Sequence, residues 1–482
     1  MEKKGFLNIL YDSLHYVNDF LWAYILIVIL IGLGVFFSIK MKFVQFTYFK
    51  EMFRVLTDKP TISATGKKGI SSFQAFTIST ASRVGTGNLA GVATAIAAGG
   101  PGAIFWMWLI ALIGGASSFI ESTLAQIYKV KDDKDGFRGG PAYYMEQGLG
   151  KRWMGVLFAF IITFCFGLVF NSVQSNTIAA AFKGSFGFSS LTVGLVLATL
   201  TAVIIFGGVK RIARITQFFV PIMAISYLLL AIFVIIQNFT EIPALFLTIF
   251  TNAFGIRQVA GGGFGAAIMM GIKRGLFSNE AGMGSAPNAA ATAAVSHPVK
   301  QGLIQTLGVF TDTVLICSAT AFIIMLSGDF HDPNLEGIQI TQAALSTHIG
   351  EWAGTFVAIA IFMFAFSSII GNYYYGETNI EFIHNNRLSL FLYRVAVIAM
   401  VIIGSTASLD FVWLLADIFM ALMAIINLIA ITLLYKVAIH ALKDYQKQRQ
   451  NGKNPIFYAD SIPGLSKVEW WHRYDGHKSE QN

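Results

Sequence analysis

Two long hydrophobic stretches of this chain are each interrupted in the middle by glycine, small polar residues and one charge. The first interruption is residues 82–88 (SRVGTGN), inside the apolar stretch 71–98, and the second is residues 278–286 (SNEAGMGSA), inside 263–294. Non-helical backbone in a bilayer must find partners in protein or in a water-filled cavity. Matched interruptions in two halves of a chain are typical of secondary transporters, which bind their substrate there. The pattern predicts a protein of that class.

The rest of the chain has the composition of a membrane protein. Hydrophobic residues make up 55% of the 482 residues, charged residues 12%, and the mean hydropathy is +0.63, whereas about 25% of a soluble domain is charged. Apolar runs of roughly 20 residues recur, each long enough to cross a hydrocarbon core of about 30 Å. We therefore expect an all-α polytopic membrane protein, and the net charge of +8 gives no reason to expect nucleic-acid binding.

The hydrophobic runs predict 11 transmembrane helices. A lead helix covers about 21–39; a first set covers 71–98, 103–128, 153–182, 191–207 and 212–236, and a second set 263–294, 302–326, 352–383, 389–404 and 409–440. Each set has an odd number of helices, so the two sets lie in opposite orientations. This predicts a five-plus-five inverted repeat with discontinuous first and sixth core helices. The expected regions are the lead helix and interfacial segment (1–69), the two repeats (70–238 and 239–440) and a cytoplasmic tail (441–482).

Shorter features agree with a repeat. In each set the loop before the third helix carries a short amphipathic segment, at 140–149 and 338–348. Residues 41–67 combine aromatic and basic side chains, which favours a helix in the membrane interface; a plain cytoplasmic loop is the alternative. Cys165 and Cys317 both fall in apolar stretches and indicate packing rather than a disulfide or a metal site.

The charges of the loops predict the orientation, because lysine and arginine accumulate on the cytoplasmic side. Seven basic residues lie within 40–68 and six within 129–152, whereas 327–351 has none and four acids. We expect the N-terminus outside, the C-terminus in the cytoplasm, and a location in the bacterial plasma membrane. Lys3 and Lys4 run against this assignment and are outnumbered.

The first interruption has the groups to bind a zwitterion and a cation. Where one half-helix ends its carbonyls can coordinate a cation, and where the next begins its N–H groups attract an anion. An amino acid with Na⁺ meets both needs. Gly85 and Gly87 permit close backbone approach, Thr86 and Asn88 can cap the restarting helix, and a carboxylate would lie on its N–H groups. The alternative is a close helix contact through Gly87 and the glycine four residues later.

Each interruption also contains a charge. Placing Arg83 or Glu280 in an apolar span costs at least roughly 2.5–3.5 kcal/mol, so each needs a partner. Arg83 and Glu280 could pair with each other, Arg83 could bind a substrate carboxylate, or Glu280 could pair with Lys273 or Arg274. Structural pairing and direct contact with substrate or ion both stay open. Three other intramembrane acids are expected to accept structural hydrogen bonds: Glu121, Asp312 and Asp417.

Polar side chains also lie on the third helix of each set. Asn171 and Gln174 are three residues apart, hence on one helix face, and the second set carries Ser367, Ser368 and Asn372. Hydroxyls beside a broken helix are suitable oxygen ligands for Na⁺, although serines also bond to their own helix. We find no dinucleotide, ATP or metal-ligand motif, so we expect no enzyme and no cofactor, with Na⁺ as the coupling ion.

Four strings resemble the alanine or glycine:cation symporter family, also called sodium:alanine symporters. They are GTGN at 85–88, GGPGAIFWMW at 99–108, RGLFSNEAGMGSAP at 274–287 and FSSIIG at 366–371. The similarity runs from about residue 70 to 385. The resemblance implies the inverted-repeat fold of the leucine-transporter type. It also implies Na⁺-driven import of alanine or glycine by alternating access, and we expect a monomer in the lipid bilayer to suffice.

Carried over motif by motif, the resemblance implies a site. The substrate would contact Ser82, Gly85, Gly87, Asn88, Asn171, Gln174, Phe277 and Ser278. Na⁺ would bind the carbonyls of Ala81 and Val84 and the hydroxyls of Ser367 and Ser368. Many members have tryptophan where this chain has Asn372, so the pocket there is smaller or more polar. Because of that substitution and the unassigned role of Arg83, the substrate could have a side chain larger or more polar than that of alanine.

Three other classes stay open. A proton-coupled amino-acid transporter of the same fold is the nearest, with Arg83 supplying the charge that an ion would. An ion channel is disfavoured because no ring of acids or filter-like repeat appears. A membrane enzyme is disfavoured because no nucleophile with a base and no metal set appears.

Overall fold

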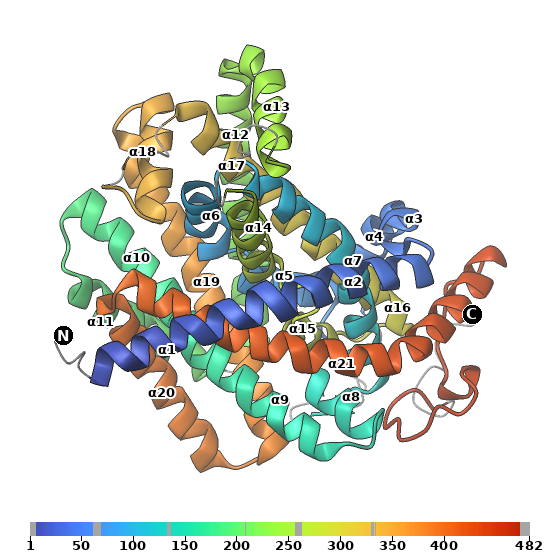
Figure 1. Ribbon diagram of the computed structural model, residues 1–482. Helices are drawn as coiled ribbons and strands as arrows, with labels where there is room; N and C mark the ends of the chain where they lie inside the picture. Colours follow the sequence, from blue (N-terminus) through green and yellow to red (C-terminus); the bar gives the residue numbers. More distant parts are fainter. Residues whose placement is uncertain are drawn as a thin grey trace.

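The computed structural model describes residues 6–60, 69–132, 136–207, 209–255, 263–328, 332 and 334–472. These residues are almost entirely helical, apart from a short antiparallel pair, β1 (Val130–Lys131) and β2 (Phe137–Arg138). Figure 1 shows long helices running across the molecule, with α1, α2 and α21 side by side. Lys3, Lys4, Lys67, Lys68 and the end of the predicted tail lie outside the described residues.

The lead helix is longer than predicted. It comprises α1 (Phe6–Phe20), a π-helical turn (Leu21–Leu26) and α2 (Ile27–Lys40), and residues 9–40 of it form one apolar span. The sequence placed its start near residue 21 because Asp12, His15, Asn18 and Asp19 interrupt the apolar residues before that point. The predicted interfacial segment contains two short helices, α3 (Val44–Thr47) and α4 (Phe49–Leu56), and its residues 61–67 lie outside the described part.

The first set of predicted helices is present with a break in its first member. The helices are α5 (Ser72–Arg83) and α6 (Val92–Gly99) on either side of the break, α7 (Ala103–Ile127), α8 (Pro141–Gln147), α9 (Arg152–Phe164) continuing into α10 (Asn171–Phe186), α11 (Ser190–Ile205) and α12 (Val209–Gln237). Helix α8 occupies the segment predicted to be amphipathic.

The second set has the same order. It contains α14 (Gly263–Asn279) and α15 (Ala286–Ala291) around the second break, α16 (Pro298–Val309) continuing into α17 (Ser318–Ser327), α18 (Ile338–Ile349), α19 (Trp352–Ile383), α20 (Arg387–Thr406) and α21 (Leu409–Gln450). Helix α18 occupies the other segment predicted to be amphipathic. The sequence missed α13 (Ile242–Ala253), which packs on α7 through a hydrogen bond from Trp106 Nε1 to the Ala253 carbonyl, 3.0 Å.

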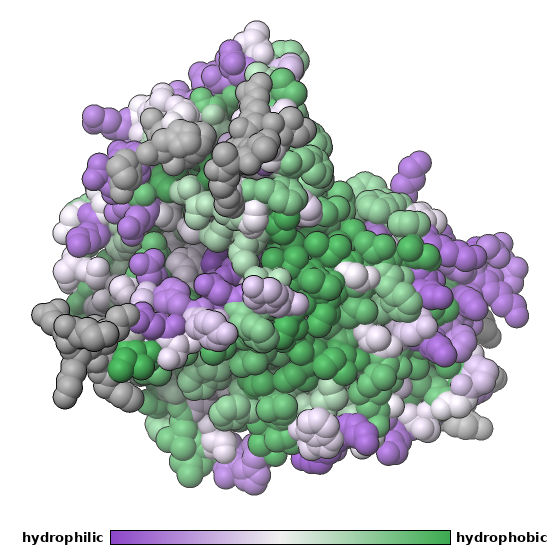
Figure 2. Space-filling view, in the orientation of Figure 1, coloured by the Kyte–Doolittle hydropathy of each residue, from purple (hydrophilic) through white to green (hydrophobic). Residues whose placement is uncertain are grey.

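Eight helices among the described residues are long and apolar enough to cross a membrane. The other three predicted crossings are the two broken helices and α11, which has 16 residues. Figure 2 shows hydrophobic residues covering the middle of one face of the molecule, with hydrophilic residues gathered toward its edges. Exposed apolar side chains of α2 and α21 include Val28, Ile39 and Leu433. This surface is that of a multi-pass membrane protein.

The chain beyond the last predicted helix is folded rather than a free tail. Helix α21 continues to Gln450, ten residues past its predicted end, and residues 455–471 then pack against the ends of other helices. The Trp471 ring is fully buried, and its Nε1 donates to the Gln126 carbonyl at 2.9 Å. Phe457 N donates to the Ser296 carbonyl at 2.9 Å. We call residues 455–471 the C-terminal strap.

The strap lies against the segment that follows the second broken helix. Ala294 N in this segment donates to the Ile70 carbonyl at 2.9 Å, which joins it to the start of α5. Lys129 Nζ donates to the Ala293 carbonyl at 3.0 Å and lies 4.7 Å from the Trp471 ring centre. The strap, α7 and the ends of both broken helices therefore meet at one end of the molecule.

We predict that Trp471→Ala detaches the strap. Truncating a buried tryptophan costs about 3–5 kcal/mol. The other contacts of the strap are few, and we expect them not to hold it against the helices without this side chain. Limited proteolysis of the purified protein should cut within 451–472 much faster than in wild type. Ser466→Ala, an exposed position in the same strap, should leave the rate unchanged; equal rates for the two variants would refute the interpretation.

Candidate substrate and sodium site

The first break begins where α5 runs out of helical hydrogen bonds. The helix starts with a capping box between Ser71 and Gln74 and ends at Val84, whose φ and ψ are extended. Beyond it, Gly85 N donates to Asn88 Oδ1 at 2.9 Å and Thr86 N donates to Gln174 Oε1 at 2.9 Å. The side-chain amide oxygens of Asn88 and Gln174 thus accept hydrogen bonds from the N–H groups at which the sequence predicts a substrate carboxylate.

The predicted cap by Thr86 is wrong. Its hydroxyl makes no hydrogen bond to any of the residues that the structure describes, because the backbone N–H groups are already taken by amide oxygens. Asn88 does act at the break, but it accepts from the residue three positions earlier. The sequence could not show that Gln174, on another helix, would supply the second acceptor.

The second break is held open by an acid on a neighbouring helix. Glu280, Gly282 and Gly284 have positive φ angles of 58°, 84° and 85°, so the chain is left-handed there. The Glu121 carboxylate on α7 accepts from Gly282 N at 3.2 Å and from Gly284 N at 3.1 Å. Asn427 Nδ2 donates to the same carboxylate at 2.7 Å. Structural hydrogen bonding of Glu121 was predicted, but not that it would stabilise the break.

The two breaks lie against each other in the interior. Ser82 Oγ is 2.8 Å from Glu280 Oε1, which joins the end of α5 to the second break. Asp312 joins them a second time, because it accepts from Asn88 Nδ2 at 2.6 Å and from Ser278 Oγ at 2.8 Å. Asp312 was predicted to have structural hydrogen bonds, and these two of its donors are predicted substrate residues; Thr313 Oγ1 is a third donor, at 2.8 Å.

The four predicted sodium ligands converge. Ser367 Oγ lies 3.5 Å from the Ala81 carbonyl oxygen, and Ser368 Oγ lies 3.3 Å from that of Val84. Both hydroxyls also lie within hydrogen-bond distance of the Phe364 carbonyl of their own helix, at 2.8 and 3.1 Å. These are neutral oxygens on a continuous helix facing the exposed carbonyls of a broken one. A sodium ion prefers such hard oxygen ligands.

The remaining predicted substrate residues surround the same place. Asn171, Gln174, Ser278 and Asn372 are buried, and Asn372 Nδ2 donates to Asn171 Oδ1 at 3.1 Å. The Phe277 ring lies between those of Phe170 and Trp413, with centroid distances of 4.5 and 4.6 Å. Gly87 has no room for a side chain, because a Cβ there would lie 3.0 Å from Phe277 Cδ1.

The ion pairs considered for the two break charges do not form among the described residues. Arg83 makes no ion pair with Glu280 or another acid of the described residues, and its Nη1 donates to the Gln305 carbonyl at 3.2 Å. Lys273 and Arg274 do not reach Glu280 either. Their Nζ and Nη2 lie 3.7 and 2.7 Å from Asp417 Oδ2 on α21, so Asp417 has charged partners rather than only hydrogen bonds. Helix rotation, which spacing alone does not give, decides these partners.

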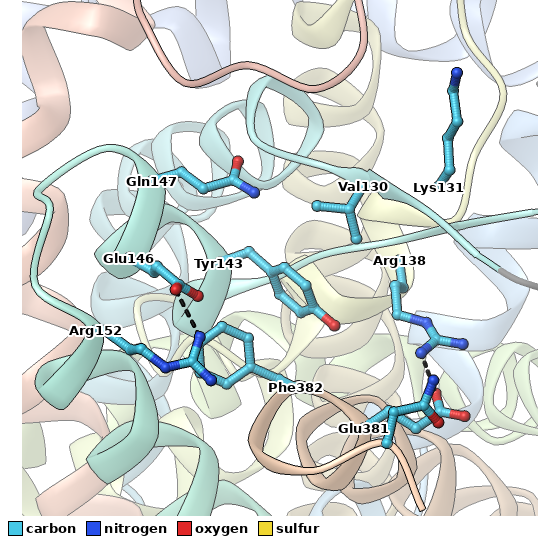
Figure 3. A pocket seen from close by; sticks show the side chains of 10 residues that line it. Val130, Lys131, Arg138, Tyr143, Glu146, Gln147, Arg152, Glu381 and Phe382 are labelled. Atoms are coloured by element: carbon cyan, nitrogen blue, oxygen red, sulfur yellow. Dashed lines mark hydrogen bonds and ion pairs between the residues drawn. The ribbon is translucent and has the colours of Figure 1, made fainter.

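A separate cavity opens beside the start of α9 and the end of α19. Its volume is about 280 Å³, and Figure 3 shows Arg138, Glu146, Arg152 and Glu381 around it. Arg138 Nη1 is 2.9 Å from Glu381 Oε2, and Arg152 Nη1 is 2.6 Å from Glu146 Oε1. The two arginines are therefore matched by acids of the same cavity. None of its lining residues belongs to the breaks.

We predict that Gly85→Ala weakens amino-acid binding at the first break. A Cβ at Gly85 would overlap Ser368 Oγ and Gln174 Oε1, and such overpacking costs about 1–3 kcal/mol, which is roughly a fivefold to hundredfold loss of affinity. Gly265→Ala is the matched control, since nothing lies within 4 Å of a Cβ there. Binding isotherms of both purified variants test this; equal affinities would contradict it.

Broken helices that meet inside a multi-pass bundle define a membrane transporter. A solved structure agrees on the fold: a manganese transporter from Eremococcus coleocola aligns with a TM-score of 0.50 at 12% identity over 79% of this chain and 81% of the other. The profile of the sodium:alanine symporter family matches residues 7–459, and the chain belongs to that family. The protein is accordingly a sodium-coupled amino-acid symporter.

Two relatives from Bacillus subtilis are similar over almost their whole length. The amino-acid carrier protein AlsT is 60% identical over 94% of this chain and 96% of its own. The probable sodium/glutamine symporter GlnT is 58% identical over 94% of each chain. The family resemblance drawn from four short strings is thus confirmed, and it extends over residues 7–459 rather than only about 70–385.

Proposed function

We propose that the chain imports a small neutral amino acid, alanine or glycine, together with Na⁺ by alternating access. The observation that carries this proposal is the contact of two serine hydroxyls on α19 with the carbonyls that end α5. Those oxygens belong to two structural units, so an ion bound among them would hold the units together. Substrate binding beside the ion would then depend on Na⁺.

In the proposed pose the amino acid lies at the first break, next to the ion. Its carboxylate takes the N–H groups of Gly85 and Thr86 in place of the amide oxygens of Asn88 and Gln174. A carboxylate is a stronger acceptor than a neutral amide. The side chain of the bound amino acid then points toward Phe277 and Ser278. These residues approach Gly87 closely, which limits the size of the substrate side chain.

A second candidate substrate has an amide side chain. Asn372 stands where many members have tryptophan, and with Asn171 and Ser82 it forms a row of hydrogen-bonding groups. A buried polar row left without partners is costly, whereas a carboxamide could pair with it. One relative described as a probable glutamine symporter is 58% identical, which adds support to this candidate.

The architecture we propose has 11 crossings arranged as two inverted repeats, 70–238 and 239–440, after the lead helix. Support comes from the order of elements, because each set opens with a broken helix and places a short helix, α8 or α18, before its third member. The basic loops then lie inside, with the N-terminus outside and the C-terminal strap in the cytoplasm of a bacterial cell. A monomer contains both breaks and is sufficient for the cycle.

We predict that Ser368→Ala raises the sodium concentration for half-maximal uptake about tenfold or more. A polar contact with a charged group contributes about 1.5–3 kcal/mol. Each 1.4 kcal/mol changes the affinity about tenfold. Ser79→Ala is the matched control, since that buried serine bonds only within its own helix, to the Phe76 carbonyl. A Ser368→Ala protein with wild-type sodium dependence would remove Ser368 from the ion site.

Proteoliposome uptake of labelled alanine tests the coupling. We expect accumulation to follow an imposed Na⁺ gradient and to increase with a negative interior, because one charge crossing 100 mV contributes about 2.3 kcal/mol. Competition by unlabelled glycine and glutamine separates the two substrate candidates. Uptake that follows a pH gradient and ignores Na⁺ would favour the proton-coupled alternative, and steady single-channel current would favour a channel.

A further inference from the structure

The contact between the two breaks contains one more acceptor than its donors can serve. Ser82 Oγ lies 2.8 Å from Glu280 Oε1 and also 2.8 Å from Asn372 Oδ1. A serine hydroxyl has one hydrogen, so it can donate to only one of these two oxygens. The other contact needs a hydrogen from the partner, or two acceptors face each other without one.

A chain of hydrogen bonds decides which contact Ser82 donates. Asn171 Nδ2 donates to the Gly167 backbone carbonyl at 2.9 Å, so its Oδ1 faces away from that carbonyl. Asn372 Nδ2 donates to this Oδ1 at 3.1 Å, which turns Asn372 Oδ1 toward Ser82. An amide oxygen only accepts. The Ser82 hydrogen therefore goes to Asn372, and Glu280 must donate to Ser82.

We propose that Glu280 is a proton-binding site and is a neutral carboxylic acid in this conformation. Its Oε1–H donates to Ser82, and its Oε2 accepts from Ser285 Oγ at 2.5 Å. The proton lies at the point where the two breaks touch, so it is part of the contact that closes them. This inference deepens the proposed function and rests on the same interior site.

The other two buried acids of the site provide the contrast. All three partners of Glu121 are nitrogen donors, from Gly282, Gly284 and Asn427. Asp312 accepts from an amide nitrogen and from hydroxyls whose hydrogens are free to point at it, those of Ser278 and Thr313. A carboxylate suits both sets, and neither requires an added proton. The hydrogen count thus selects Glu280 alone.

The titratable groups that face Glu280 come from each element packed against it. Arg83 belongs to α5, Asp312 to the π-helical segment after α16, and Tyr375 to α19, while Cys165 lies between α9 and α10. Glu121 on α7 binds the same break two and four residues further on. Arg83 is the one cation among these described groups, and it donates to a backbone carbonyl rather than to Glu280.

The proton has a consequence for the transport cycle. A conformation that separates the breaks takes Ser82 away from Glu280 and admits water, and a glutamate in water is ionised at neutral pH. Closing the two breaks then takes up one proton, and opening them releases it to the side that has opened. By linkage, alkaline pH disfavours the closed conformation.

Infrared difference spectroscopy of the full-length protein in lipid tests directly whether Glu280 carries a proton. Wild type at neutral pH should show a carboxylic-acid C=O band that Glu280→Gln lacks. The glutamine amide can keep both hydrogen bonds, donating to Ser82 and accepting from Ser285, so this variant should fold. Glu146→Gln, which alters a partly exposed acid, should retain the band. No such band in wild type, or its survival in Glu280→Gln, would overturn the inference.

A transport measurement provides a second test of the Glu280 proton. Exchange of labelled for unlabelled alanine, at equal pH and Na⁺ on both sides, should fall in wild type by about tenfold per pH unit once Glu280 loses its proton. In Glu280→Gln this alkaline decline should be absent, whatever the absolute rate. A decline that persists in the variant would assign it to another group. If alanine is not carried at all, the infrared result still decides the protonation of Glu280.

Discussion

The structure depends on side chains that satisfy backbone groups where two membrane helices stop being helical. In a bilayer, unpaired N–H and C=O groups cannot turn to water, so each break exists only because neighbours supply partners. Amide oxygens of Asn88 and Gln174 serve the first break, and the Glu121 carboxylate serves the second. Carbonyls and hydroxyls at the first break thereby become available to an ion. The candidate site follows from this one requirement.

That requirement also explains how charge is arranged in the interior. Glu121 lies on two N–H groups, Asp312 collects three donors from both breaks and its own turn, and Asp417 has Arg274 and Lys273 beside it. Each acid stabilises a junction between helices that must keep its shape. Glu280 differs because its partners are hydroxyls, which can accept as well as donate. A group of that kind can change protonation without leaving a donor unpaired.

The glycines at the breaks illustrate how far sequence reasoning reaches. A glycine-rich interruption in an apolar run predicts irregular backbone at membrane depth, and both interruptions are irregular in the structure. The serine pair and the GTGN string select residues that lie close together in the structure, with Ser367 and Ser368 beside the carbonyls of Ala81 and Val84; their roles toward ion and substrate stay a proposal. Spacing left the partners of Arg83, Lys273 and Arg274 open, and the structure gives them partners that were not among the alternatives. Spacing along one helix gives a face, but not which neighbour that face meets.

What the sequence determined by itself is the class of protein, the order of the long apolar stretches, and the two breaks, because hydropathy and glycine act locally along the chain. Tertiary structure alone decided the longer lead helix, the folded C-terminal strap, the acceptors at each break and the direction of every hydrogen bond around Ser82. Those depend on residues hundreds of positions apart, such as Glu121 with Asn427 and Ser82 with Asn372. Their contact is fixed by how whole helices pack, which no local pattern contains.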